Sequence, residues 1–120
     1  MNFFLLINIL VSLTILNVWL LRFNKKTPYR GGASNTLKEE FLVYGLPTWF
    51  MYLIGSIKVT LAVLLIVGIW FPIINQYVIY SMILLMAGAV LMHLKVKDPL
   101  KKSLPALSIL LLLLSIIILN

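Results

Sequence analysis

Lys58 is the residue of this chain best placed to do chemistry, because it lies inside an apolar run. The segment YLIGSIKVTLAVLLIVGIWFP, residues 52–72, carries no other charge. A lysine at the centre of a membrane helix costs about 2.5–3.5 kcal/mol to insert, so such a residue faces a bundle interior or a wet cavity. We expect Gly55, Lys58 and Ala62 to share the packed face of a helix, where the two small residues admit a neighbouring helix.

The sequence offers few partners for this ammonium group. Glu39 and Glu40 are the carboxylates that closely precede the segment, and a fold-back of their own segment could bring one of them inward. Otherwise Lys58 would have to use neutral acceptors. The candidate neutral acceptors are Asn8, Ser12, Asn17, Tyr52 and Tyr80. Two interpretations stay open: a polar contact that locks helices together, or a ligand or proton site.

His93 is the second candidate for chemistry. It shares a helical face with Met82, Met86 and Ala89, and Gly88 beside them permits close helix packing. His93 could bind a ligand, shuttle a proton, or donate to a loop carbonyl at the end of its helix. One histidine without any cysteine does not make a convincing metal or haem site, so we expect no metal and no cofactor other than a possible quinone.

The composition places these residues in a membrane protein. Hydrophobic residues make up 62% of the chain and charged residues 11%, whereas soluble domains are about 45–50% apolar and about 25% charged. Cysteine is absent, which excludes disulfides and thiolate chemistry. The net charge of +7 is expected to set orientation and attract anionic lipid, not nucleic acid.

The positions of the charges predict an all-α fold, a transmembrane four-helix bundle that forms one domain over residues 1–120. Residues 1–21 are expected to be a retained helix instead of a cleaved signal, because they lack a basic start and a small-residue cleavage site. We expect the second and third helices to be separated by a break from Pro72 to Gln76. The predicted spans are 2–21, 48–70, 75–94 and 103–119.

Basic residues predict the orientation. The loop 22–47 contains five of them, the loop 95–102 contains four, and the loop between the second and third spans contains none. Basic loops face the cytoplasm, so both termini should lie on the other side of the membrane, which we expect to be a bacterial inner membrane.

Local signals in the first loop predict a short amphipathic helix before the second span. Thr36 and Glu39 form a capping box, and Gly45 can end the helix. The apolar face of this helix would consist of Leu37, Phe41 and Tyr44.

Three charged loop residues have two possible roles each. Arg22 and Arg30 could hold lipid phosphate, at about 1 kcal/mol per residue, or could serve only orientation and turn formation. Asp98 could cap the last helix or pair with Arg22 or Arg30.

Two segments, EEFLVYGLPTWFMYLIGSIKV and LLMAGAVLMHLKVKDPLKKSLPAL, give the chain a family resemblance. In the order and spacing of their motifs, over residues 36–107, they resemble the DoxX-like family of small four-helix membrane proteins. The resemblance implies a four-helix bundle but not one reaction, since relatives are linked to thiosulfate oxidation by quinone, to redox-stress complexes and to receptor assembly. The positions that match the family pattern are Glu40, Gly45, Pro47, Gly55, Lys58, Gly88, His93, Asp98 and Pro99.

The absence of cysteine departs from the redox branches of that family and argues against a thiol-based role. We therefore expect a non-catalytic accessory subunit or assembly factor of a larger membrane complex. The alternative is a quinone- or lipid-binding component of a membrane redox system, in which Lys58 binds the ligand and His93 or Tyr80 carries the proton. A small transporter ranks third. The expected partners are membrane lipids and either another protein or a second copy of the chain, but no nucleic acid.

Overall fold

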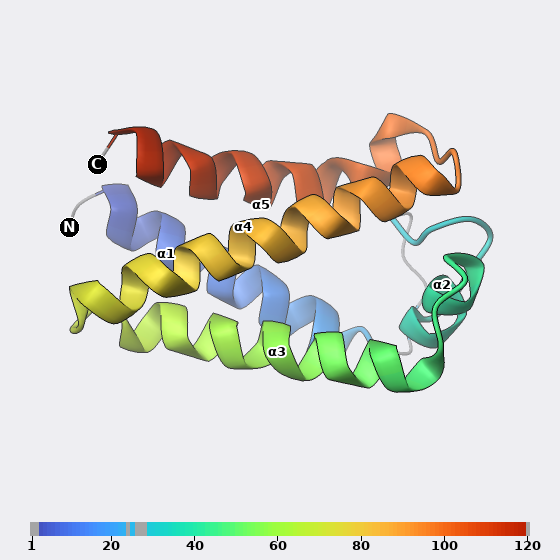
Figure 1. Ribbon diagram of the computed structural model, residues 1–120, viewed down its shortest axis with the longest axis horizontal. Helices are drawn as coiled ribbons and strands as arrows, with labels where there is room; N and C mark the ends of the chain where they lie inside the picture. Colours follow the sequence, from blue (N-terminus) through green and yellow to red (C-terminus); the bar gives the residue numbers. More distant parts are fainter. Residues whose placement is uncertain (1–2, 24, 26–28, 120) are drawn as a thin grey trace.

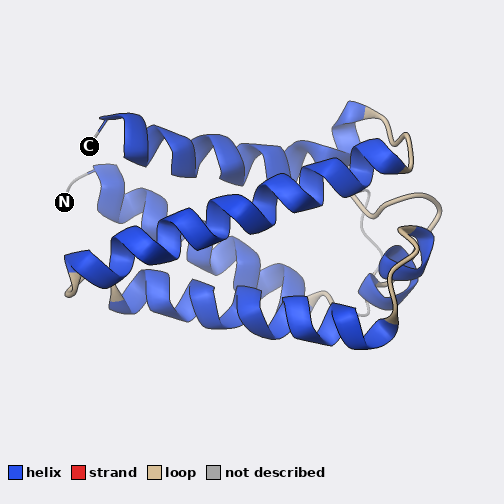
Figure 2. Cartoon of the chain, in the orientation of Figure 1, coloured by secondary structure: helices blue, strands red, loops and turns tan. Residues whose placement is uncertain are grey.

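The computed structural model describes all residues except 1–2, 24, 26–28 and 120, and its regular elements over the described ranges are helices. Figures 1 and 2 show their arrangement. In chain order they are α1 (Phe3–Leu16), the π-helical turn η1 (Asn17–Leu21), α2 (Leu37–Val43), α3 (Thr48–Val67), α4 (Pro72–Lys95) and α5 (Leu100–Leu119).

The long helices form an antiparallel bundle. α1 with η1, α3, α4 and α5 are each long and apolar enough to cross a membrane, which confirms the predicted four-helix class for the described residues. α3 packs against α1 and α4, while α5 packs against α4 and α1. The termini lie at one end of the bundle, and α2 lies with the α4–α5 turn at the other, within a molecule of 40 × 25 × 19 Å (Figure 1).

The turn between α3 and α4 lies earlier than predicted. The chain leaves α3 at Gly68, and Pro72 begins α4 instead of belonging to the break, so the expected break at Pro72–Gln76 was wrong. Proline suits the first position of a helix, because the N–H that it lacks has no partner there. The last helix also starts earlier, at Leu100 instead of 103, so that Pro105 lies inside it.

α2 forms as the local signals predicted. The backbone N–H of Glu39 donates to the Thr36 hydroxyl at 3.2 Å, and the Glu39 carboxylate accepts from the N–H of Asn35 at 2.9 Å. Gly45 follows the helix with a φ of 81°, which glycine adopts without strain. The apolar face of α2, formed by Leu37, Phe41 and Tyr44, is buried and covers the end of the bundle.

The predicted small-residue face of α3 packs against η1 and α1. A Cβ built at Gly55 would lie 2.6 Å from the ring of Trp19, so only glycine fits there. About two turns further along α3, the fully buried Ala62 accepts a hydrogen bond at its carbonyl oxygen from the Ser12 hydroxyl, at 2.5 Å. Both contacts confirm close packing at Gly55 and Ala62, as expected where small residues let helices approach.

We expect the substitution Gly55→Ala to lower the free energy of unfolding by about 1–3 kcal/mol, because the new methyl group would overlap the Trp19 ring. Gly88→Ala is the matched control, since a Cβ at Gly88 would meet no atom within 4 Å. Thermal unfolding of both variants in mild detergent measures the difference. Equal midpoints for the two variants would contradict the contact.

Candidate ligand-binding cavity

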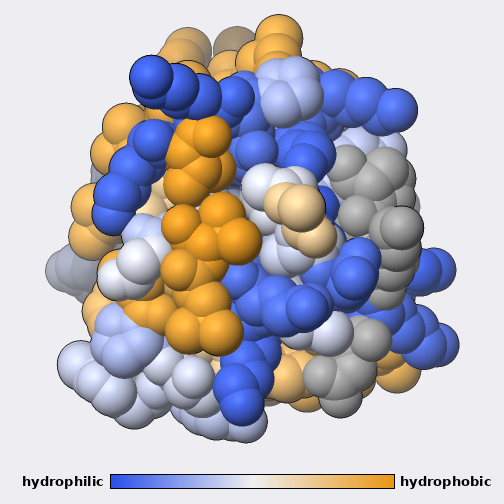
Figure 3. Space-filling view, turned by 90° about the vertical axis from the view of Figure 1, so that its right-hand side faces the viewer, coloured by the Kyte–Doolittle hydropathy of each residue, from blue (hydrophilic) through white to orange (hydrophobic). Residues whose placement is uncertain are grey.

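A cavity of about 570 Å³ lies in the half of the bundle nearest α2. Its wall includes residues of η1 and of every helix, and most of the lining side chains are apolar. The volume falls within the range of about 300–1,000 Å³ that is usual for small-molecule sites. Figure 3 views this end of the molecule, where hydrophilic atoms cover much of the surface and a hydrophobic strip runs between them.

Lys58 lines this cavity from α3. Its side chain is only 9% exposed, which confirms the interior position expected from the sequence. The ammonium lies over the ring of Trp19, with Nζ 5.3 Å from the ring centroid, in a cation–π arrangement. Among the described residues, no carboxylate oxygen lies within 4.0 Å of this nitrogen, although Glu40 attracts it from further away.

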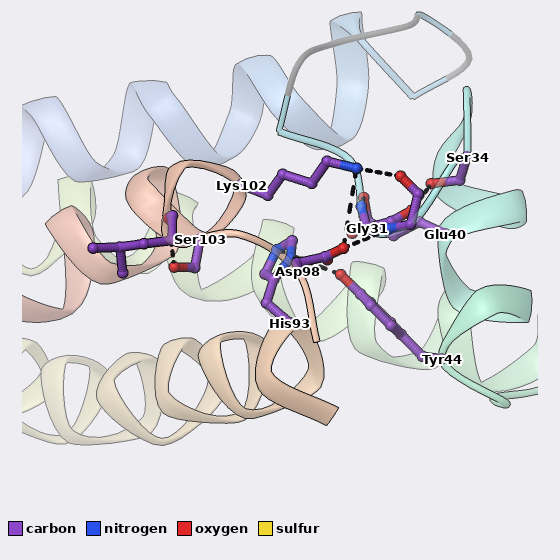
Figure 4. Close-up of polar contacts among 10 residues, drawn as sticks. Gly31, Ser34, Glu40, Tyr44, His93, Asp98, Lys102 and Ser103 are labelled. Atoms are coloured by element: carbon purple, nitrogen blue, oxygen red, sulfur yellow. Dashed lines mark hydrogen bonds and ion pairs between the residues drawn. The ribbon is translucent and has the colours of Figure 1, made fainter. Parts of the chain in front are cut away.

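Three polar side chains, those of Asp98, His93 and Tyr44, form a hydrogen-bonded string beside the cavity at the α4–α5 turn (Figure 4). His93 Nδ1 lies 2.8 Å from Asp98 Oδ2, and His93 Nε2 lies 3.4 Å from the hydroxyl of Tyr44. The second Asp98 oxygen accepts the N–H of Gly32 at 3.0 Å. Asp98, His93 and Tyr44 therefore join the 31–32 turn, α4 and α2 into one hydrogen-bonded unit.

These contacts exclude one of the alternatives that the sequence left open for His93 and one of those for Asp98. His93 pairs with a carboxylate instead of a loop carbonyl, and Asp98 pairs with His93 and, at 4.0 Å, with Lys102 instead of with Arg22 or Arg30. The cause is the end of α4, where Lys97 has a φ of 57° and the Asp98 N–H donates to the His93 carbonyl at 3.0 Å. This tight turn carries the Asp98 side chain back toward the His93 ring.

Glu40 and Tyr44 face the cavity from α2. The Glu40 carboxylate accepts the N–H of Gly31 at 3.0 Å, which ties α2 to the preceding loop. Burial raises the pKa of Tyr44, and the negative charge of Glu40, a hydrogen bond to Glu40 and the charge of Asp98 raise it further, against a smaller opposite effect of Arg30. The Tyr44 phenol therefore stays protonated and can donate a hydrogen bond.

Arg30 is buried at the loop side of the cavity. Its guanidinium donates to the carbonyl oxygens of Arg22 and Lys25, the second at 3.1 Å, so part of its role is to hold the turn. Burial lowers the pKa of Arg30, while the nearby Glu40 and Tyr44 act in the opposite direction.

The cavity unites most of the residues that the sequence singled out. Lys58, Glu40, His93 and Asn17 all line it, together with the loop residues Arg22 and Arg30. Glu39 does not, because it is exposed and engaged in capping α2.

Two predictions about α4 do not hold. Tyr80 is 48% exposed and borders a separate hollow near the α3–α4 turn, so it does not lie near Lys58 as proposed. The close helix contact expected at Gly88 is not found either, since this glycine lines the cavity without a near neighbour. Tyr80 is exposed because the rotation of α4 turns Val78, Ile79 and Met82 inward instead.

Sequence reasoning missed the parts played by Tyr44 and Trp19. Tyr44 was assigned only to an apolar helix face, although its hydroxyl is the one polar group on that face. Trp19 was not assigned any contact, although a residue as small as Gly55 on a packed face calls for a bulky side chain opposite. Neither the Tyr44 hydroxyl nor the small size of Gly55 shows from the sequence which residue it contacts.

A bundle of four membrane-length helices with a half-buried loop helix at one end is a multi-pass membrane protein. The chain belongs to the DoxX-like family, whose family model matches residues 31–117 and thus confirms the resemblance. The match covers α2, α3, α4, most of α5 and the Asp98–His93–Tyr44 string. Comparison with curated proteins and with solved structures gave no match.

Proposed function

We propose that the protein binds a quinone- or lipid-like molecule in the cavity below α2. The observation that carries this proposal is the buried Lys58 ammonium, which lines a largely apolar cavity and has no hydrogen-bond partner among the described residues. A buried charge without a hydrogen-bonded partner is costly, whereas an oxygen atom of a ligand would satisfy it. Apolar walls with a few converging polar groups are typical of small-molecule sites.

The polar string would fix the second contact to the ligand. Tyr44 and His93 both line the cavity, and Asp98 orients the His93 ring toward the Tyr44 hydroxyl. In a redox role, Tyr44 and His93 would be the candidate proton carriers, in place of the Tyr80 considered from the sequence. With the basic loops on the cytoplasmic side, the cavity would occupy the cytoplasmic half of an inner membrane.

The role of accessory subunit or assembly factor stays a prediction. The outer faces of the helices carry exposed apolar side chains, such as Leu91 on α4 and Leu111 on α5, which lipid and a protein partner would cover equally well. The cavity instead gives a specific observation in favour of ligand binding.

Native mass spectrometry of the full chain, purified in mild detergent, tests the proposal. We expect a retained hydrophobic ligand in the wild type and its loss from Gly88→Leu, since the new side chain would enter space that holds no protein atom within 4 Å of the Cβ. Ser81→Leu, at an exposed position on the same helix outside the cavity, is the matched control and should keep the ligand. Full occupancy in a folded Gly88→Leu variant would refute binding in this cavity.

A further inference from the structure

The cavity carries an excess of positive charge. Lys58, Arg30, Arg22 and Lys102 all line it, whereas Glu40 is the carboxylate among its described lining residues. The surplus is not a property of the exposed loops alone, because two of these cations lie inside the protein.

Lys58 and Arg30 are the two buried cations, with exposed fractions of 9% and 4%. The backbone carbonyls that Arg30 contacts orient its guanidinium but bring no negative charge, and its Nε has no hydrogen-bond partner in the described part of the chain. No described carboxylate oxygen lies within 4.0 Å of a charged nitrogen of either side chain. Each buried cation thus lacks a close counter-charge, an arrangement that is costly without a ligand.

Glu40 shows that the two cations act on one region. Its carboxylate interacts electrostatically with both Lys58 and Arg30. One of its oxygens already accepts the Gly31 N–H, which fixes the carboxylate at the wall. Because two buried cations share this single negative charge, a second negative charge, brought by a ligand, would balance them.

We propose that the ligand of this cavity is an anionic amphiphile, whose phosphate or carboxylate head group lies between Lys58 and Arg30. This assignment rests on the proposed function and specifies the class of its ligand. A neutral quinone could accept a hydrogen bond from Lys58, but it would leave Glu40 as the one counter-charge for the two buried cations. A phosphate or carboxylate accepts charge-assisted hydrogen bonds from both, and the planar guanidinium of Arg30 suits such a group well.

The rest of the cavity accommodates the apolar chain of such a molecule. Phe50 and Ile54 from α3 and Ile109 from α5 are among its apolar lining residues. Leu84 also lines it, although this side chain is 74% exposed on a membrane-length helix. The cavity therefore reaches the lipid-facing surface, where an acyl chain can enter.

Binding of matched lipids to the full chain in a neutral detergent tests the assignment. The probes are palmitoyl-lysophosphatidylglycerol, the zwitterionic palmitoyl-lysophosphatidylcholine, decylubiquinone and inorganic phosphate, each titrated and followed by native mass spectrometry. We expect the anionic lysolipid to bind about tenfold or more tightly than its zwitterionic counterpart, because only the former carries net charge.

Substitutions then place the head group. Lys58→Met should weaken binding of the anionic lysolipid by about 10- to 100-fold, the usual effect of losing a hydrogen bond to a charged group. Glu40→Gln should strengthen it, because the competing negative charge is gone. Lys101→Met removes the same charge at an exposed position outside the cavity and should leave binding unchanged. If Lys58→Met does not fold, the opposite shift in Glu40→Gln still decides the outcome.

The alternative outcomes separate this assignment from the proposed function. Preferential binding of decylubiquinone, abolished by Gly88→Leu, would overturn the anionic head group and keep the cavity as a ligand site. Inorganic phosphate that binds as tightly as the lysolipid would overturn the amphiphile and leave a free-anion site. Equal binding of both lysolipids, insensitive to Lys58→Met and to Glu40→Gln, would also overturn the assignment. If none of the probes binds, both proposals fail.

Discussion

Replacement of Trp19 by alanine is expected to lower the free energy of unfolding by about 3–5 kcal/mol, the usual cost of removing a buried tryptophan side chain. The Trp19 ring fills the space beside Gly55, lies 6.0 Å from the ring of Phe41 and supports the Lys58 ammonium. Its loss would remove three contacts at once: the packing of η1 against α3, the packing against Phe41 of α2, and the cation–π contact with Lys58.

Thermal and denaturant unfolding in mild detergent measure this effect. Trp49→Ala is the matched control, because Trp49 is 67% exposed on α3 and its removal leaves no internal cavity. Trp19→Phe should fall between the wild type and the alanine variant, since a smaller ring still fills part of the space. If Trp19→Ala and Trp49→Ala unfold at the same temperature, the packing of Trp19 against Gly55 does not hold the bundle together.

Replacement of Asp98 by alanine is expected to lower the free energy of unfolding by about 2–4 kcal/mol. The change leaves the Gly32 N–H and the His93 ring without their acceptor, and each unsatisfied buried group costs about 1–3 kcal/mol. Lys102 would also lose its ion pair, although at 4.0 Å and partly exposed this pair contributes little.

Asp98→Asn is the matched control, because the amide oxygen can still accept one of the two hydrogen bonds. It should retain part of the lost stability, and limited proteolysis should cut the loop before α2 faster in the alanine variant than in the asparagine variant. Wild-type stability in Asp98→Ala would show that the Asp98–His93–Tyr44 string does not join the loop to α4.

Much of the fold could be predicted from the sequence, because it follows from local or periodic features. Four apolar runs separated by charges define four membrane-length helices, and Thr36, Glu39 and Gly45 define the short helix α2. The inward face of α3 follows from the spacing of Gly55, Lys58 and Ala62 alone. Each of these signals lies within one helix or one turn of chain.

The partners inside the candidate site could not be predicted in the same way. The pairing of Tyr44 with His93 joins residues 49 positions apart, and it depends on how α2 folds back over the end of α4. The position of Lys58 over Trp19 likewise depends on the rotation and depth of η1 relative to α3.

The amino-acid sequence by itself therefore determined that this chain forms four membrane-length helices, that α2 is capped before the second of them, and that Lys58 faces inward. Only the tertiary structure decided that Tyr44 instead of Tyr80 borders the cavity and that Gly88 keeps space open instead of closing a contact. The physical reason is that hydrophobic periodicity fixes which face of a helix is buried, whereas side-chain packing between helices fixes what that face meets.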